Sequence, residues 1–169
     1  KMLDNDDGYL EIRQFGADTV DLVKEGVATL AKNKPKAVII DLRNNPGGYL
    51  DDVAPIASQF IAPNVVVKER YKDGRTDLIR STDVPVLPNT PLFVLVNGGS
   101  ASAAEILAGA LQDYKRATLI GQKTFGKGSV QEISPLKAGA ALRLTIAEWL
   151  TPLDRQISKK GIEPDLVVE

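Results

Sequence analysis

The stretch Leu92–Glu105, LFVLVNGGSASAAE, joins an apolar run to a glycine turn and then to a run of small residues. Five consecutive apolar residues are typical of a buried strand, and the alanines that follow predict a helix over 101–114. The segment 36–62 has the same order, with KAVIIDL, then RNNPGG, then a second predicted helix over 49–62. Two such units predict an α/β fold in which helices flank a mixed, partly parallel sheet. Sites in such sheets lie where strands end and helices begin, and both glycine loops fall there.

The rest of the chain predicts further strands and one further helix. A helix is expected over 18–32, and the segment 65–80 resembles a hairpin around KDGR at 72–75. The predicted strands are 8–15, 36–42, 65–70, 76–80, 92–96, 117–120, 130–133, 142–147 and 166–168. The 169 residues have the length of one ordinary domain.

The composition excludes several kinds of chemistry. The chain has no His and no Cys, so a Ser-His-Asp triad, a thiol nucleophile and a thiolate zinc site are all excluded. Nucleophilic catalysis would therefore need Ser or Thr, with Lys, a carboxylate or Tyr as the base. We expect no metal and no cofactor. The net charge of -1 predicts no nucleic-acid partner, and no apolar run is long enough to predict a membrane span.

The stretch Gly121–Ser129, GQKTFGKGS, is close to a phosphate-binding loop. That loop requires a hydroxyl residue directly after its lysine, but Gly128 follows Lys127 here. It must also open a helix, whereas the segment 129–134 alternates like a strand. We therefore expect no nucleotide at this loop.

The stretch Ser134–Lys137 has the Ser-x-x-Lys spacing of penicillin-recognising enzymes. That motif needs a helix to bring serine and lysine onto one face. Pro135, Gly139 and the flanking strand patterns predict a hairpin loop instead.

Serines at the start of the predicted helix 101–114 have two interpretations. Amides at a helix N-terminus can stabilise an oxyanion beside a serine nucleophile. Alternatively, Ser102 and Glu105 form a capping box, or Ser100 is a simple N-cap. The loop 43–48 has the same ambiguity, because its glycines suit either a plain turn or amides aimed at a substrate carbonyl. The residues alone do not choose between Ser100 and Ser102.

Four stretches in order resemble one family, the carboxyl-terminal processing or tail-specific proteases. They are DLRNNPGGYL, VNGGSASAAEIL, GQKTFGKGSVQ and TPLDRQISKKGIEPD, and the likeness runs from about Gly8 to the last residues. The resemblance implies a ClpP/crotonase-like layered core, with 1–169 as a single catalytic core domain. One departure is Asp154, where the family usually has Gly, which puts the local turn geometry in question.

The resemblance also implies the site residues of a serine endopeptidase. Ser102 matches the nucleophile, Lys127 the base and Gln131 the assisting residue. The oxyanion hole would be made by backbone N–H groups of Gly47 or Gly48 and of Ala103. Because positions four apart share a face of a strand, we expect Gln131 to reach back toward Lys127.

A lysine acts as a general base only when its amine is neutral, and burial favours the neutral form. Phe125, Gly126 and Gly128 around Lys127 carry no charge that would keep it protonated. We therefore expect a largely desolvated Lys127, whereas Lys159 and Lys160 are expected to be ordinary surface lysines.

The family resemblance further implies substrates, partners and location. The substrates would be proteins or peptides with apolar carboxyl-terminal residues, cleaved near their tails through an acyl-enzyme. A PDZ domain usually precedes this core, and we find none in these residues; either one lies upstream in the full-length protein or this member lacks it. The implied location is extracytoplasmic, in the bacterial envelope or periplasm, secreted, or in the chloroplast lumen.

Three other readings stay open. Related domains bind hydrophobic ligands or peptides without cutting them, and crotonase-type acyl-CoA enzymes use a similar oxyanion hole without a serine nucleophile. The isolated core could also be folded but inactive, if missing segments complete its site.

Overall fold

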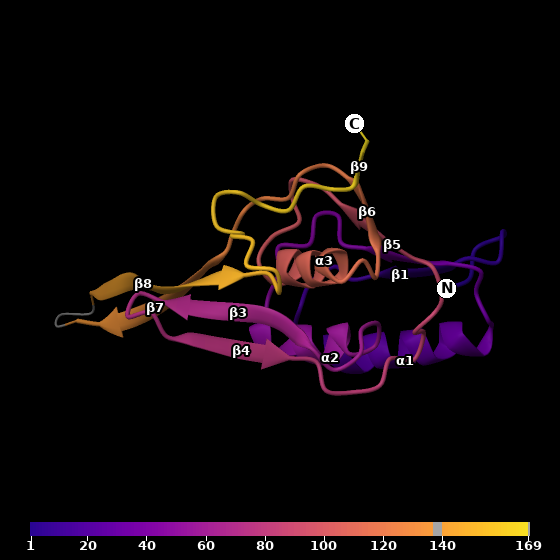
Figure 1. Ribbon diagram of the computed structural model, residues 1–169, viewed down its shortest axis with the longest axis horizontal. Helices are drawn as coiled ribbons and strands as arrows, with labels where there is room; N and C mark the ends of the chain where they lie inside the picture. The colour runs from indigo at the N-terminus through magenta and orange to yellow at the C-terminus, as the bar shows by residue number, and fades with distance from the viewer. Residues whose placement is uncertain (137–139, 169) are drawn as a thin grey trace.

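The structure is a computed structural model that describes residues 1–136 and 140–168. Its larger sheet is wholly parallel (Figure 1). Its strand order is β1-β2-β5-β6-β9. These strands are β1 (Gly8–Glu11), β2 (Val38–Asp41), β5 (Leu92–Val96), β6 (Thr118–Gly121) and β9 (Leu166–Val167). Parallel neighbours need crossover connections, and the two predicted glycine loop–helix units supply those from β2 to β5 and from β5 to β6. The carboxyl ends of β2 and β5 therefore meet at one edge, where both loops emerge.

The other strands form a separate antiparallel sheet, ordered β4-β3-β8-β7. They are β3 (Val65–Tyr71), β4 (Thr76–Arg80), β7 (Ser129–Pro135) and β8 (Ala141–Leu150). Figure 1 shows this sheet extending to the left, away from the helices. The predicted hairpin around 72–75 is confirmed as the β3–β4 connection. The prediction of a partly parallel α/β fold is confirmed, with parallel and antiparallel strands in different sheets.

Two of the three predicted helices match the structure and one is too long. The helices are α1 (Thr19–Lys32), the 3₁₀ turn η1 (Leu50–Asp52), α2 (Val53–Ala57) and α3 (Ala103–Asp113). The helix expected over 49–62 starts as a 3₁₀ turn and ends at Ala57. Pro55 has no N–H to continue hydrogen bonds from the preceding turn. Beyond Ala57 the chain turns so that Phe60 and Ile61 enter the core.

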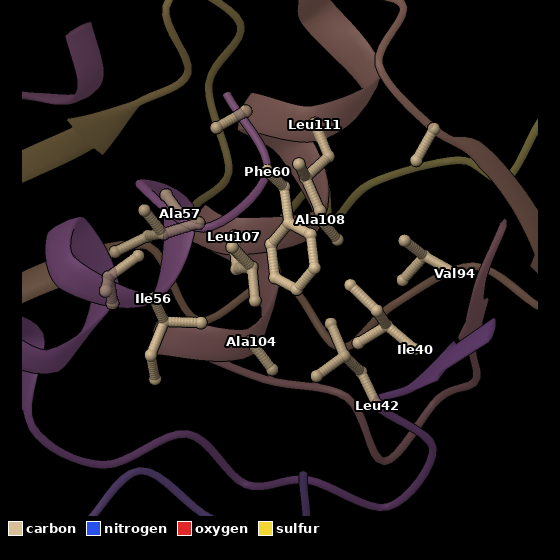
Figure 2. Packing of buried hydrophobic residues seen from close by; sticks show 14 of the residues in the cluster. Ile40, Leu42, Ile56, Ala57, Phe60, Val94, Ala104, Leu107, Ala108 and Leu111 are labelled. Carbon is tan, nitrogen blue, oxygen red and sulfur yellow. The ribbon is translucent and has the colours of Figure 1, made fainter. Parts of the chain in front are cut away.

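Helix α3 is the centre of the core, because every residue from Ala103 to Leu111 is buried. Figure 2 shows Leu107 and Ala104 beside Phe60, with Ile40 and Val94 of the parallel sheet nearby. Small alanine side chains let α3 lie close to both α2 and the sheet. This packing holds the start of α3 at the sheet edge where the glycine loops emerge.

The turn at Asp154 keeps a conformation that suits glycine. Its φ is +63°, in the left-handed region. Lys68 Nζ lies 2.9 Å from both carboxylate oxygens of Asp154. The turn therefore retains a left-handed residue although no glycine is present.

No helix within residues 1–136 and 140–168 is long and apolar enough to cross a membrane. The same residues contain no group of three or more His, Cys, Asp or Glu side chains that could hold a metal ion.

The end of β2 is anchored by the buried carboxylate of Asp41. It accepts hydrogen bonds from Tyr9 Oη at 2.7 Å and from the Arg43 guanidinium at 2.6 and 2.9 Å. Burial acts to raise the pKa of Asp41, but the hydrogen bonds from Arg43 and Tyr9 outweigh it, so the pKa is lowered overall. The same bond from its hydroxyl to Asp41 raises the pKa of Tyr9. These contacts fix the first residue of the loop 43–48.

This lowered pKa predicts a pH-dependent contribution to stability. The carboxylate is favoured in the folded chain, so its contribution is fully present above the unfolded pKa of about 3.9 and is lost as pH falls through the lower folded value. Asp41→Asn should therefore destabilise the chain at about pH 6 and much less at about pH 2. Urea unfolding at both pH values tests this, with the exposed Asp83→Asn as control. An equal effect of Asp41→Asn at both pH values would contradict it.

Packing around α3 predicts the cost of a cavity. Leu107 is fully buried, so Leu107→Ala should lower the free energy of unfolding by about 2–5 kcal/mol. The matched control is Leu22→Ala, because the Leu22 side chain is 63% exposed and should change stability by less than about 0.5 kcal/mol. Urea denaturation of the three proteins measures both values. Similar losses for the two variants would show that α3 is not the centre of the core.

Candidate active site

Ser102 ends the loop after β5 and directly precedes α3. Its backbone has φ +57° and ψ −121°, a conformation that costs a non-glycine residue about 1–3 kcal/mol. Serine nucleophiles of several hydrolases occupy such a strained strand-to-helix turn. Only 6% of its surface is exposed. The strain marks Ser102 as the unusual residue of this loop.

Ser100, the other candidate serine, is committed to structural hydrogen bonds. It is fully buried, its hydroxyl donates to the carbonyl oxygen of Leu42 at 2.7 Å, and it accepts the N–H of Asn97 at 3.0 Å. The bond to Leu42, the residue before the loop 43–48, joins the two glycine loops. The geometry therefore separates the two serines, which the sequence did not.

The loop 43–48 lies directly against Ser102. A Cβ atom added to Gly47 would stand 2.6 Å from Ser102 Cβ and 2.7 Å from the carbonyl oxygen of Ala101. A Cβ on Gly48 would stand 1.8 Å from the carbonyl oxygen of Phe15. Both glycines have positive φ, +92° and +146°. Only residues without side chains fit here: Gly47 allows the loop to approach Ser102, and Gly48 allows it to approach Phe15.

The three predicted oxyanion donors differ in what they bind. The N–H of Gly47 donates to Asn45 Oδ1 at 2.8 Å. The N–H groups of Gly48 and Ala103 donate to no atom of residues 1–136 and 140–168. The available donors beside Ser102 are therefore those of Gly48 and Ala103.

Glu105 joins the start of α3 to the loop that contains Lys127. Its side chain is fully buried, and its Oε2 accepts the N–H of Ser102 at 2.9 Å and the N–H of Lys127 at 2.8 Å. Its Oε1 accepts Thr124 Oγ1 at 2.5 Å and the N–H of Gly126 at 2.7 Å. A buried charge is stable only when it is well paired, and here four donors surround it. One carboxylate thus fixes the main chain at both Ser102 and Lys127.

The side chain of Lys127 is exposed, so the prediction that it is desolvated is wrong for this structure. Its backbone is held by Glu105, but its amine makes no hydrogen bond or ion pair with the described part of the chain. A lack of charged neighbours does not by itself bury the Lys127 side chain. Gly126 and Gly128 have no side chains to cover the amine, and Phe125 is itself 68% exposed. Lys159 and Lys160 are exposed, as predicted.

Gln131 lies exposed on β7, and its position relative to Lys127 does not follow from strand geometry. Lys127 precedes β7, and the register shifts between Val130 and Gln131, so strand alternation does not relate the two residues. No hydrogen bond joins Gln131 to Lys127 or Ser102 within 1–136 and 140–168. The structure brings together Ser102, the glycine loop and the Lys127 backbone, but not the Gln131 side chain.

Neither look-alike motif has its required context. The residues after Lys127 enter strand β7 rather than a helix, so GQKTFGKGS does not form a phosphate-binding loop. Ser134 and Pro135 also lie in β7, where Ser-x-x-Lys spacing cannot place both side chains on one helical face. Lys137 and Gly139 lie outside the described residues.

Three positions build this site beyond what their sequence pattern indicates: Glu105, Asn45 and Thr124. The predicted capping role of Glu105 is confirmed by its bond to the Ser102 N–H, but its wider role is not visible in the capping pattern. A glutamate within an otherwise apolar, alanine-rich helix must be paired when the helix is buried. That signal could have identified it as a hub.

A family model and individual relatives of known proteins all match this chain to the same peptidase family. The model of peptidase family S41 matches residues 6–168. The chain is 43% identical over 173 residues to a carboxy-terminal-processing protease of Bartonella bacilliformis, covering 99% of the chain and 40% of that protein. It is 42% identical over 162 residues to a carboxyl-terminal-processing protease of Synechocystis sp., covering 96% of the chain and 38% of that protein.

The fold is also that of a solved structure of the photosystem II D1 C-terminal processing protease. The TM-score is 0.90 at 33% identity, over 96% of this chain and 42% of that one. This similarity confirms the predicted ClpP/crotonase-like fold. The chain spans about 40% of the length of these relatives. With a family match over nearly its whole length, the chain belongs to peptidase family S41.

Proposed function

We propose that this chain is the catalytic core of a serine peptidase that cleaves protein substrates at or near their carboxyl-terminal tails. Membership of family S41 and the names of the relatives support the reaction class. The observation that supports the residue assignment is the carboxylate of Glu105. Its Oε2 accepts the backbone N–H groups of Ser102 and Lys127 together, so the main chains of the proposed nucleophile and base are adjacent.

In the proposed mechanism, the neutral amine of Lys127 takes the proton of the Ser102 hydroxyl as its oxygen attacks a peptide carbonyl. The N–H groups of Gly48 and Ala103 stabilise the oxyanion. The ammonium of Lys127 then gives its proton to the departing amine, leaving an acyl-enzyme on Ser102. Water attacks this ester, Lys127 again takes a proton, and the carboxylic acid product leaves.

Exposure of Lys127 sets a condition on this mechanism. Water favours the charged form of an amine, so the base must be covered before it can act. We propose that a bound substrate chain covers Lys127 and that Gln131 helps to orient the amine once substrate lies between them. Under this proposal the free chain holds the backbone of the site ready, and substrate completes it.

Two exposed aromatic residues adjoin the loops of the site and offer apolar surface for substrate tails. Tyr49 directly follows Gly48 and is 61% exposed, and Phe125 is 68% exposed. The N–H of Phe125 donates to the carbonyl oxygen of Ser100 at 3.0 Å, which keeps it close to the serine loop. We propose that these two rings contact apolar side chains of the substrate, and that the protein acts outside the cytoplasm, as its family resemblance implies.

The exposed Lys127 also favours a second candidate function. A lysine without a covering environment suits a non-catalytic module that binds hydrophobic ligands or peptides on the same fold. Such a module would still bind an apolar tail but would not acylate Ser102. Labelling by a fluorophosphonate, which reacts only with activated serines, separates these two functions.

Replacing the proposed dyad should abolish cleavage. Ser102→Ala should lower kcat/KM for an unfolded protein with an apolar tail by about 10³-fold or more, and Lys127→Ala by about 10²–10⁴-fold. The matched control is Lys160→Ala, because Lys160 is also an exposed lysine and should leave the rate unchanged. Cleavage assays with all three variants measure this. Near wild-type cleavage by Ser102→Ala or Lys127→Ala would end the assignment.

Removing the charge of Glu105 should loosen both halves of the site. In Glu105→Gln the amide nitrogen cannot accept hydrogen bonds, so two of the four donors lose their partner at about 1–3 kcal/mol each. The free energy of unfolding measured in urea and the rate of fluorophosphonate labelling should both fall. The control is Glu163→Gln, since the Glu163 carboxylate forms an exposed ion pair with Lys123 and its replacement should cost less than about 1 kcal/mol. Equal effects of the two changes would remove Glu105 from its linking role.

A further inference from the structure

Asn45 is fully buried in the loop after β2 and uses both ends of its side-chain amide. Its Nδ2 donates to the carbonyl oxygen of Ile12 at 2.6 Å, and its Oδ1 accepts the N–H of Gly47 at 2.8 Å. Its backbone oxygen accepts the N–H of Ala101 at 2.9 Å. This single residue therefore ties the glycine loop to the segment after β1 and to the serine loop.

The bond from Gly47 to Asn45 closes a short turn across Pro46. Pro46 has no N–H, so Gly47 carries the first amide proton after Asn45 that can return to its side chain. The turn fixes the direction of the Gly47 N–H and places the Cα of Gly47 against Ser102.

The next peptide unit has a fixed direction as well. The carbonyl oxygen of Gly47 accepts the N–H of Phe15 at 2.9 Å. In a planar trans peptide the C=O and the following N–H point to opposite sides. The N–H of Gly48 therefore points away from Phe15, and it donates to no described residue.

We propose that Asn45 is a positioning residue that selects which amide of the glycine loop serves as oxyanion donor. By occupying the N–H of Gly47 and anchoring the loop to Ile12, it leaves the N–H of Gly48 as the free donor beside Ser102. The catalytic part of this inference rests on the proposed peptidase function. The arrangement of the two amides does not, and can be measured without any activity.

Amide hydrogen exchange in the intact chain tests the arrangement directly. The Gly47 amide should exchange at least about tenfold more slowly than that of Gly48, because only Gly47 is hydrogen-bonded. Asn45→Ala should remove the protection of Gly47, whereas Asn89→Ala, at an exposed asparagine, should not. Fast exchange of Gly47 in the unaltered chain would overturn the proposal, even if Asn45→Ala failed to fold.

Kinetics test the catalytic part. Asn45→Ala should lower kcat by about 10²-fold while KM changes by less than about threefold, since an oxyanion donor acts mainly in the transition state. The affinity for a peptide aldehyde, which forms a tetrahedral adduct, should fall by a similar factor. Asn45→Asp keeps an acceptor for Gly47 but loses the donor to Ile12, and we expect a smaller loss of kcat.

The outcomes separate this inference from the proposed function. Unchanged kcat and aldehyde affinity in Asn45→Ala, with cleavage lost in Ser102→Ala, would reject Asn45 as a positioning residue and leave the peptidase assignment standing. Wild-type cleavage by Ser102→Ala would instead reject the peptidase assignment. If Asn45→Ala instead raised KM, lowered kcat and lowered the folded fraction together, Asn45 would have a purely structural role and the proposal would be rejected.

Discussion

The site depends on one buried carboxylate, that of Glu105. A charge in the interior is tolerated only when its oxygens are fully hydrogen-bonded, and the four donors here come from both ends of the site. Helix α3 carries the carboxylate and is itself held by the core. The requirement to pair this charge therefore draws the Lys127 loop onto the start of α3.

The second constraint is the contact between two glycine loops at one edge of the parallel sheet. The loop after β2 lies against Ser102 because Gly47 has no side chain, and against Phe15 because Gly48 has none. Asp41 holds the first residue of this loop, Asn45 its middle, and the bond from Ser100 to Leu42 joins it to the serine loop. In this way the rigid sheet places backbone donors beside a strained serine.

Most of the fold could be predicted from local patterns. Apolar runs and glycine turns gave the parallel strands and α3, because burial and turn geometry leave direct traces in the residues. The predicted helix over 49–62 is longer than α2, which ends at Ala57. The chain leaves the helical path there because Phe60 packs into the core, and that packing involves residues distant in the sequence. Strand alternation also does not relate Gln131 to Lys127, since Lys127 lies outside β7 and a register shift intervenes.

The sequence by itself determined the chemistry available to the site: serine and lysine in glycine-bounded loops, with no imidazole or thiol. It did not determine which serine is strained, which glycine amide is free, or whether the lysine amine is covered. Those properties depend on hydrogen bonds between segments far apart in the chain, such as Asn45 with Ile12 and Glu105 with Lys127. Only the tertiary structure decides them, because a donor's partner and a side chain's exposure are set by what packs against it in space.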